Sequence, residues 1–115
     1  MKINPKLFLF TALAAILLSG CSPVSNQVQV TLTEWGINLD ISEVPAGEVI
    51  FTVSNQGLLE HNFLIEGTEI QLDLIPVNSQ AAITVNLEPG RYMILCSLPG
   101  HEEAGMRTEF TVLPY

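Results

Sequence analysis

The sequence predicts an all-β domain, folded as a Greek-key β-sandwich of seven to eight short strands. Three observations support this prediction. Apolar and polar side chains alternate with the period of two that half-buried strands show. The alternating runs are rich in β-branched and aromatic residues, and Gly, Pro and Asn turns separate them. Beyond residue 27 no stretch keeps a helical period, so frequent turns between short strands favour a sandwich.

Each predicted strand is an apolar or alternating run that ends at a turn signal. The turns include Pro45-Ala46-Gly47, Asn55-Gln56-Gly57 and Glu88-Pro89-Gly90. A longer loop with Gly and Pro, residues 97–105, separates the last two runs. The runs cover residues 28–33, 37–41, 48–54, 61–65, 70–74, 81–87, 92–96 and 108–113. A chain of 115 residues is long enough for one such domain and too short for a multidomain enzyme.

The N-terminus has the order of an export signal. Lys2 and Lys6 precede the apolar run 7–18, and Ser19 and Gly20 lead directly to Cys21. The run is too short to span a membrane, which takes about 20 apolar residues. Leu18-Ser19-Gly20-Cys21 resembles a bacterial lipobox, which implies that Cys21 is lipidated. A plain signal peptide with an incidental cysteine is the less favoured alternative.

These features divide the chain into three parts. Residues 1–20 are expected to be a lipoprotein signal peptide, 21–27 the lipidated cysteine and a short tether, and 28–115 the folded domain. The protein is therefore expected to be exported and lipid-anchored at a membrane, on the periplasmic or extracytoplasmic face. From residue 21 onward two arginines stand against twelve acids, a net charge of −10. No basic cluster exists to neutralise phosphates, so a nucleic-acid partner is not expected.

A constellation of soft and borderline donors points to a metal site. Cys96, His101 and Met106 follow one another in a C-x4-H-x4-M spacing between two predicted strands, and His61 begins an earlier strand. If Cys21 is lipidated, Cys96 has no disulfide partner in the chain, and a metal would occupy its thiol. Singly, each residue is more often ordinary packing or surface. Together they match a type 1 copper site, in which two His and one Cys form a plane with a weak axial Met.

With this set of residues, the sequence resembles the cupredoxin family over roughly residues 28–113. The motif Asn55-x-Gly57-x-x-x-His61-Asn62-Phe63 is similar to the family's first ligand segment, and Pro89-Gly90-x-Tyr92-x-Ile94-x-Cys96-Ser97 to the strand before its cysteine. The spacing of the copper loop is most like that of rusticyanins and sulfocyanins. The resemblance implies one copper ion bound by His61, Cys96, His101 and Met106. It also implies that Asn62 and Ser97 bond to each other around the site, with the Asn62 amide donating to the thiolate.

The expected function is that of a mononuclear blue copper protein, a one-electron carrier at the membrane surface. A type 1 centre offers no open substrate position, so no enzymatic activity is expected. A redox donor and a redox acceptor would dock transiently near His101, and the protein would be a monomer. Copper delivery to a copper oxidase is the alternative, to be distinguished by release of Cu(I). A zinc hydrolase is a third hypothesis and far less favoured than the two copper functions, because Met106 is a poor zinc ligand and no general base is evident.

Overall fold

The first predicted strand corresponds to β1 (Asn26–Thr33). Every second side chain of β1 is buried, as the alternation of apolar and polar residues predicts. The structure, a computed structural model, describes residues 14–16, 18, 20 and 26–115. Cys21 and most of the predicted signal peptide lie outside these residues. Among the residues that are described, no helix is long and apolar enough to cross a membrane.

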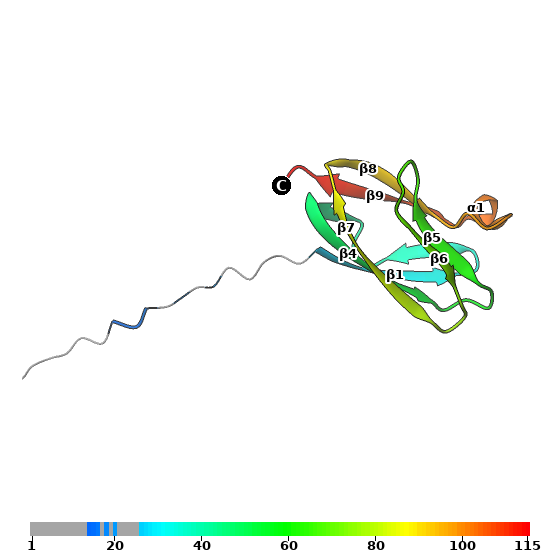
Figure 1. The fold of residues 1–115 in the computed structure, drawn as a ribbon, viewed down its shortest axis with the longest axis horizontal. Helices are drawn as coiled ribbons and strands as arrows, with labels where there is room; N and C mark the ends of the chain where they lie inside the picture. Colours follow the sequence, from blue (N-terminus) through cyan, green and yellow to red (C-terminus); the bar gives the residue numbers. More distant parts are fainter. Residues whose placement is uncertain (1–13, 17, 19, 21–25) are drawn as a thin grey trace, which may run out of the picture.

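Two sheets form the domain (Figure 1). The first has the order β2-β1-β4-β7, and the second β3-β9-β8-β5-β6. The pairs β1–β4 and β3–β9 are parallel and the other pairs are antiparallel. The remaining strands are β2 (Gly36–Leu39), β3 (Glu43–Pro45), β4 (Gly47–Asn55), β5 (His61–Ile65), β6 (Gln71–Ile75), β7 (Gln80–Leu87), β8 (Gly90–Leu95) and β9 (Arg107–Leu113).

The predicted fold class is confirmed, with nine strands among the described residues where the sequence predicted seven or eight. The additional strand is β3, whose last residue, Pro45, was assigned to a turn. Proline is tolerated there because β3 lies at the edge of its sheet. The first strand also begins two residues early, because Asn26 pairs with β4 and its Nδ2 donates to the Pro45 carbonyl at 2.9 Å. The last two residues of the predicted tether are therefore strand.

Aromatic side chains join the two sheets at the centre of the core. Phe51 of β4 contacts Phe63 of β5 and Phe110 of β9, with ring centroids 5.3 Å apart in both pairs. All three rings are fully buried. Tilted and edge-on pairs of this kind contribute about 0.5–1.5 kcal/mol each beyond their buried area. The core thus fixes β5 and β9, which lead to and from the predicted ligands.

The domain has two distinct ends. At one end the start of β1 lies close to the end of β9, since Pro45 accepts from Asn26 and Ala46 donates to Leu113 at 2.8 Å. At the other end lies α1 (His101–Ala104), a single helical turn inside the predicted loop 97–105 (Figure 1). A turn this short leaves no hydrophobic period in the sequence, so it was not predicted. Away from α1, the Tyr92 hydroxyl donates to the Glu88 carbonyl at 2.7 Å, the hydrogen bond that defines a tyrosine corner.

Candidate metal centre

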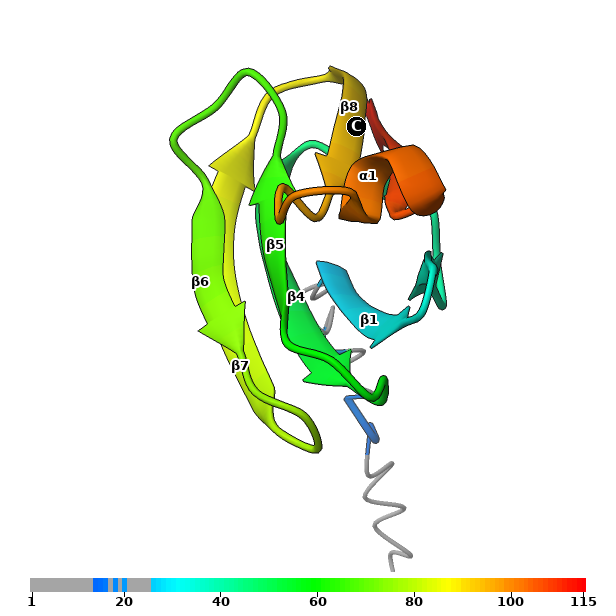
Figure 2. The same cartoon turned by 90° about the vertical axis from the view of Figure 1, so that its right-hand side faces the viewer.

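Sheet topology brings the four predicted ligands to the α1 end of the sandwich. His61 is the first residue of β5, Cys96 follows β8 directly, and β5 and β8 are neighbours with Leu64 opposite Leu95. His101 begins α1 and Met106 precedes β9. Because β8 and β9 form a hairpin, the loop between them must return to its start. Figure 2 views the sandwich from this end, with α1 in front of β8.

Three of the four predicted ligands converge on one point. The Nδ1 atoms of His61 and His101 lie 3.1 Å apart, and Cys96 Sγ lies 3.6 Å from His101 Nδ1. The donor atoms of these three residues all fall within 4.8 Å of one another. His61 and Cys96 are fully buried and His101 is half-buried. Two imidazoles and a thiol without a carboxylate among them are a donor set suited to copper or zinc.

The backbone of Met106 is hydrogen-bonded to Cys96 and His101 of this cluster. Its carbonyl accepts from Cys96 N at 3.1 Å, and its amide donates to the His101 carbonyl at 3.1 Å. Its side chain is fully buried. The two bonds close the loop 96–106 into a fixed shape, so the positions of Cys96, His101 and Met106 depend on one another.

The Asn62 and Ser97 hydrogen bonds expected around the site are present. Asn62 Nδ2 donates to Ser97 Oγ at 2.8 Å, and Ser97 N donates to Asn62 Oδ1 at 2.8 Å. Asn62 N also points at Cys96 Sγ at 3.5 Å, within the longer range of bonds to sulfur. The segment after His61 and the segment after Cys96 are therefore tied together. Such contacts hold donor atoms in place and adjust the electronic character of the sulfur.

Glu34 is a site residue that sequence reasoning missed. It follows the end of β1, and its Oε1 lies 2.7 Å from His61 Nε2. Its Oε2 accepts from Leu58 N at 2.8 Å and its Oε1 from Leu59 N at 3.0 Å. Donation by the Leu58 amide above all, with further donation by Leu59 and His61, lowers the pKa of the Glu34 carboxyl below its ordinary value, although partial burial opposes this. A separation of 27 residues from His61 left no motif to reveal the contact.

The neighbouring Trp35 contacts the other histidine. Its ring meets the His101 ring nearly edge to face, with centroids 4.9 Å apart and an interplanar angle of 72°. Trp35 is 44% exposed, and no role was predicted for it. Its carbonyl lies against Gly105, where a Cβ would approach within 2.8 Å and φ is +128°. Glycine is therefore required at position 105 for the β1–β2 turn to pack on the ligand loop.

The charged residues around α1 lie outside the donor cluster. Glu60 is exposed while its neighbour His61 is buried, because adjacent side chains of an extended chain point to opposite faces. Glu102 forms an ion pair with Arg107, which ties α1 to the start of β9. Glu103 is exposed. The donor cluster is therefore formed by nitrogen and sulfur, and Glu60, Glu102 and Glu103, unlike Glu34, form no hydrogen bond or ion pair with its histidines.

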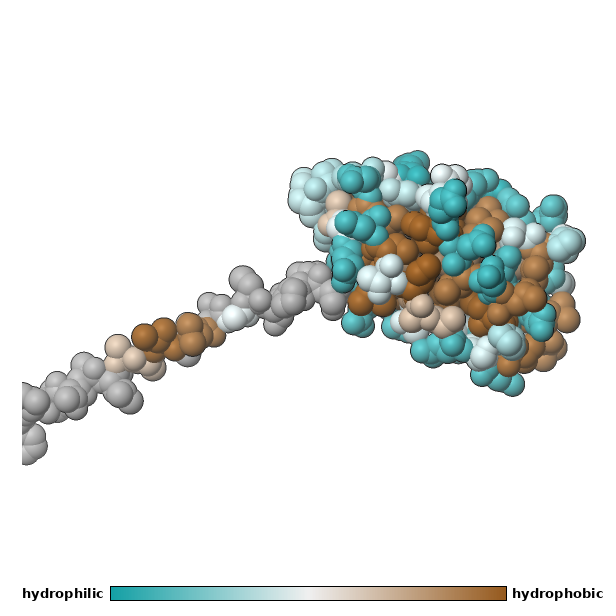
Figure 3. Space-filling model, in the orientation of Figure 1, coloured by the Kyte–Doolittle hydropathy of each residue, from teal (hydrophilic) through white to brown (hydrophobic). Residues whose placement is uncertain are grey.

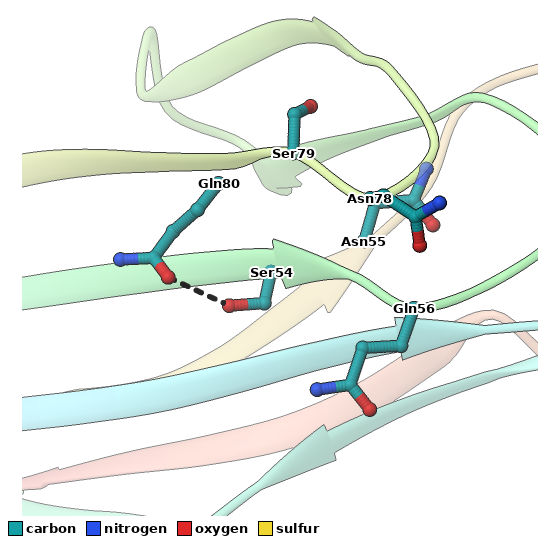
Figure 4. Close-up of a pocket in the computed structure, with 6 residues that line it drawn as sticks. All are labelled: Ser54, Asn55, Gln56, Asn78, Ser79 and Gln80. Carbon is teal, nitrogen blue, oxygen red and sulfur yellow. Dashed lines mark hydrogen bonds between the residues drawn. The ribbon is translucent and has the colours of Figure 1, made fainter.

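A shallow polar hollow of about 240 Å³ lies at the ends of β4 and β7 (Figure 4). Its lining contains none of the predicted ligands, and within it Ser54 Oγ donates to Gln80 Oε1 at 3.2 Å. The six lining residues are uncharged: Ser54, Asn55, Gln56, Asn78, Ser79 and Gln80. It offers no donor set comparable to the His-Cys-His cluster.

Comparisons with known proteins agree with this geometry. A family model described as a cupredoxin-like domain matches residues 6–112. A search of curated proteins gave no match. Among solved structures, the chain is similar to the dithionite-reduced auracyanin of the photosynthetic bacterium Roseiflexus castenholzii, with a TM-score of 0.63 and 22% identity over 78% of this chain and 98% of that one.

Two further auracyanin structures are similar. Auracyanin B gives a TM-score of 0.68 at 20% identity, over 81% of this chain and 91% of that one. Auracyanin A of Chloroflexus aurantiacus, described as a "blue" copper protein, gives 0.62 at 19% identity, over 76% and 98%. At such identities the likeness shows a shared fold alone.

Proposed function

Because the chain belongs to the cupredoxin-like family, we propose that it is a mononuclear type 1 copper protein that carries one electron. The observation that carries this proposal is the convergence of His61, Cys96 and His101 donor atoms within 4.8 Å. His61, Cys96 and His101 would be the strong ligands and Met106 the weak axial one. The C-x4-H-x4-M spacing, which resembles that of rusticyanins and sulfocyanins, sets the length of the loop that carries three of them.

When bound, copper would supply a Cu(I)/Cu(II) couple, and a thiolate, a thioether and two imidazoles suit both oxidation states. The residues of this chain hold the donor atoms nearly fixed. Cys96 is buried and bonded through the Asn62 amide, and the loop to Met106 is closed by its own backbone bonds. A site that moves little between oxidation states exchanges electrons with little reorganisation. The proposed activity is accordingly electron transfer without substrate chemistry.

The proposed membrane attachment depends on Cys21, which lies outside the described residues. Two features support it: the lipobox-like segment before Cys21, and the position at which the chain enters the folded domain. The chain enters β1 at the end of the sandwich opposite to α1 (Figure 1). A lipid anchor on this side would leave the candidate metal centre facing away from the membrane, where a donor and an acceptor could reach it.

An apolar surface near His101 is the proposed docking site for redox partners. Leu58 is 87% exposed and Leu59 47% exposed, and Trp35 adds an aromatic surface beside His101. Pro99 is exposed, whereas Leu98 is half-buried against the core and contributes less to this surface. Figure 3 shows apolar surface reaching this end of the domain. A small patch of this kind suits brief encounters, and the net charge of −10 from residue 21 onward would favour partners with a basic rim.

Repeated redox cycling separates electron transfer from copper delivery. The copper-loaded protein is reduced and reoxidised in the presence of a Cu(I) chelator, and both the absorbance and the bound copper are followed. An electron carrier keeps its copper through many cycles, since the metal stays in its site in both states. Loss of Cu(I) to the chelator on each reduction would contradict the proposal and favour a role in delivery.

A further inference from the structure

Glu34 determines which nitrogen of His61 is free to bind a metal. An ionised carboxylate accepts hydrogen bonds and cannot donate them. The contact of 2.7 Å between Glu34 Oε1 and His61 Nε2 therefore places the proton on Nε2. In the neutral imidazole the lone pair then lies on Nδ1, the atom that faces His101 Nδ1 and the thiol of Cys96.

The carboxylate itself is held in place from several sides. Both oxygens are engaged by the Leu58 and Leu59 amides of the β4–β5 loop, and the side chain is only 21% exposed. Gly57 lies so close that a Cβ there would collide with the carboxylate. Glu34 is therefore an anchored anion beside a fully buried histidine, with little freedom to turn to solvent.

We propose that Glu34 is a positioning residue of the metal centre, which holds His61 in the Nε2–H tautomer and favours the oxidised metal through its negative charge. The proposal rests on the proposed copper function and deepens it. Carboxylate partners of this kind orient metal-binding histidines and make them better donors. A fixed negative charge close to a site stabilises its more positive oxidation state, so Glu34 should lower the reduction potential.

A purely structural role would have a different signature. If Glu34 served only to join the β1–β2 turn to the β4–β5 loop, its loss would lower stability through the Leu58 and Leu59 bonds alone. The tautomer of His61 and the potential would then stay unchanged. These two quantities therefore separate positioning of the ligand from attachment of the loop.

The tautomer is tested in the metal-free, full-length protein by 15N chemical shifts of His61. In the wild type, Nε2 is expected to carry the proton. Glu34→Ala should remove this preference and lower copper affinity by about 10- to 100-fold. Should the alanine variant fail to fold, Glu34→Asp keeps the charge but withdraws the carboxylate by one methylene, and a weakened preference is expected. An unchanged tautomer in the folded variant would overturn the proposal.

The charge is tested by the potential of the copper-loaded full-length protein with Glu34→Gln, since glutamine keeps an acceptor oxygen for His61. We expect the Cu(II)/Cu(I) equilibrium to shift about tenfold toward the reduced form, which is about 59 mV for one electron. Glu60→Gln is the matched control, because it removes the same charge from an exposed residue next to His61. Equal shifts in both variants would refute a specific role of Glu34. A wild type without a blue site would refute the copper function instead, while the metal-free tautomer would still decide on Glu34.

Discussion

Replacement of Asn62 by alanine tests how firmly the two ligand segments are joined. The substitution removes two hydrogen bonds of 2.8 Å, from Asn62 Nδ2 to Ser97 Oγ and from Ser97 N to Asn62 Oδ1. A protein hydrogen bond contributes about 0.5–1.5 kcal/mol net, and water can replace the lost partners because both bonds are exposed. We therefore expect the free energy of unfolding of the metal-free protein to fall by about 1–2 kcal/mol.

Urea denaturation measures this loss directly. With a slope of about 1–2 kcal/mol/M for a small domain, the midpoint should fall by about 1 M. Ser97→Ala is the matched partial change, because it removes the Oγ acceptor and keeps the backbone donor, so about half the loss is expected. Asn86→Ala on the exposed face of β7 is the control, with an expected effect within about 0.5 kcal/mol.

Two results would refute the reasoning. If Asn62→Ala lowered stability no more than Ser97→Ala, the bond from Ser97 N would contribute nothing. If neither change differed from the control, the link between the β5 and post-β8 segments would be incidental, and the ligands would have to be positioned by the core and the loop bonds alone.

Four other predictions address the site and its surroundings. Met106→Leu should keep copper and raise the potential, and Met106→Gln should lower it, because an apolar neighbour disfavours the more charged oxidised state; voltammetry giving no change would point to another axial group. Leu59→Lys should slow electron transfer to a partner more than a lysine placed on β7, measured by stopped flow at matched potential; equal rates would place the docking surface elsewhere. Cys21→Ser should release the protein from membranes in a fractionation assay with the copper spectrum intact, and retention in the membrane would contradict lipidation there. The lowered pKa of Glu34 implies a stabilising contribution that is complete above the ordinary pKa of a glutamate and is lost as the pH falls through the lower value of the folded protein. Glu34→Gln should therefore weaken the acid dependence of metal-free stability, and an unchanged profile would contradict this.

The fold was largely predictable because every described strand except β3 carries its own sequence signal. Alternation in β1 and the β-branched run in β4 report burial that is repeated at every second residue. The edge strand β3 has three residues and ends in proline, too short for a pattern to emerge. The single turn α1 is flanked by Gly100 and Gly105, both with positive φ, and its four residues include no buried side chain. Such elements form because tertiary contacts fix them, and local sequence does not reveal them.

The part of the site that depends on short sequence spacings could be predicted. Cys96 and His101 lie in one loop and His61 follows a recognisable turn, so the convergence of these three residues could be anticipated. Glu34 and Trp35 could not be found in this way, because their contacts with His61 and His101 depend on how the β1–β2 turn packs against loops far along the chain. Nothing in the residues around them distinguishes them from an ordinary strand end. Contacts of this kind require the assembled fold.

The optical and EPR spectrum of the oxidised, copper-loaded protein tests the central claim most directly. A thiolate bound to Cu(II) in a type 1 geometry gives intense visible absorption and a narrow copper hyperfine splitting. The wild type is expected to be blue, and Cys96→Ser to lose the absorption, since a hydroxyl cannot replace the soft thiolate. A copper-loaded wild type without this absorption, or a Cys96→Ser variant that keeps it, would contradict the assignment of Cys96 and with it the proposed function.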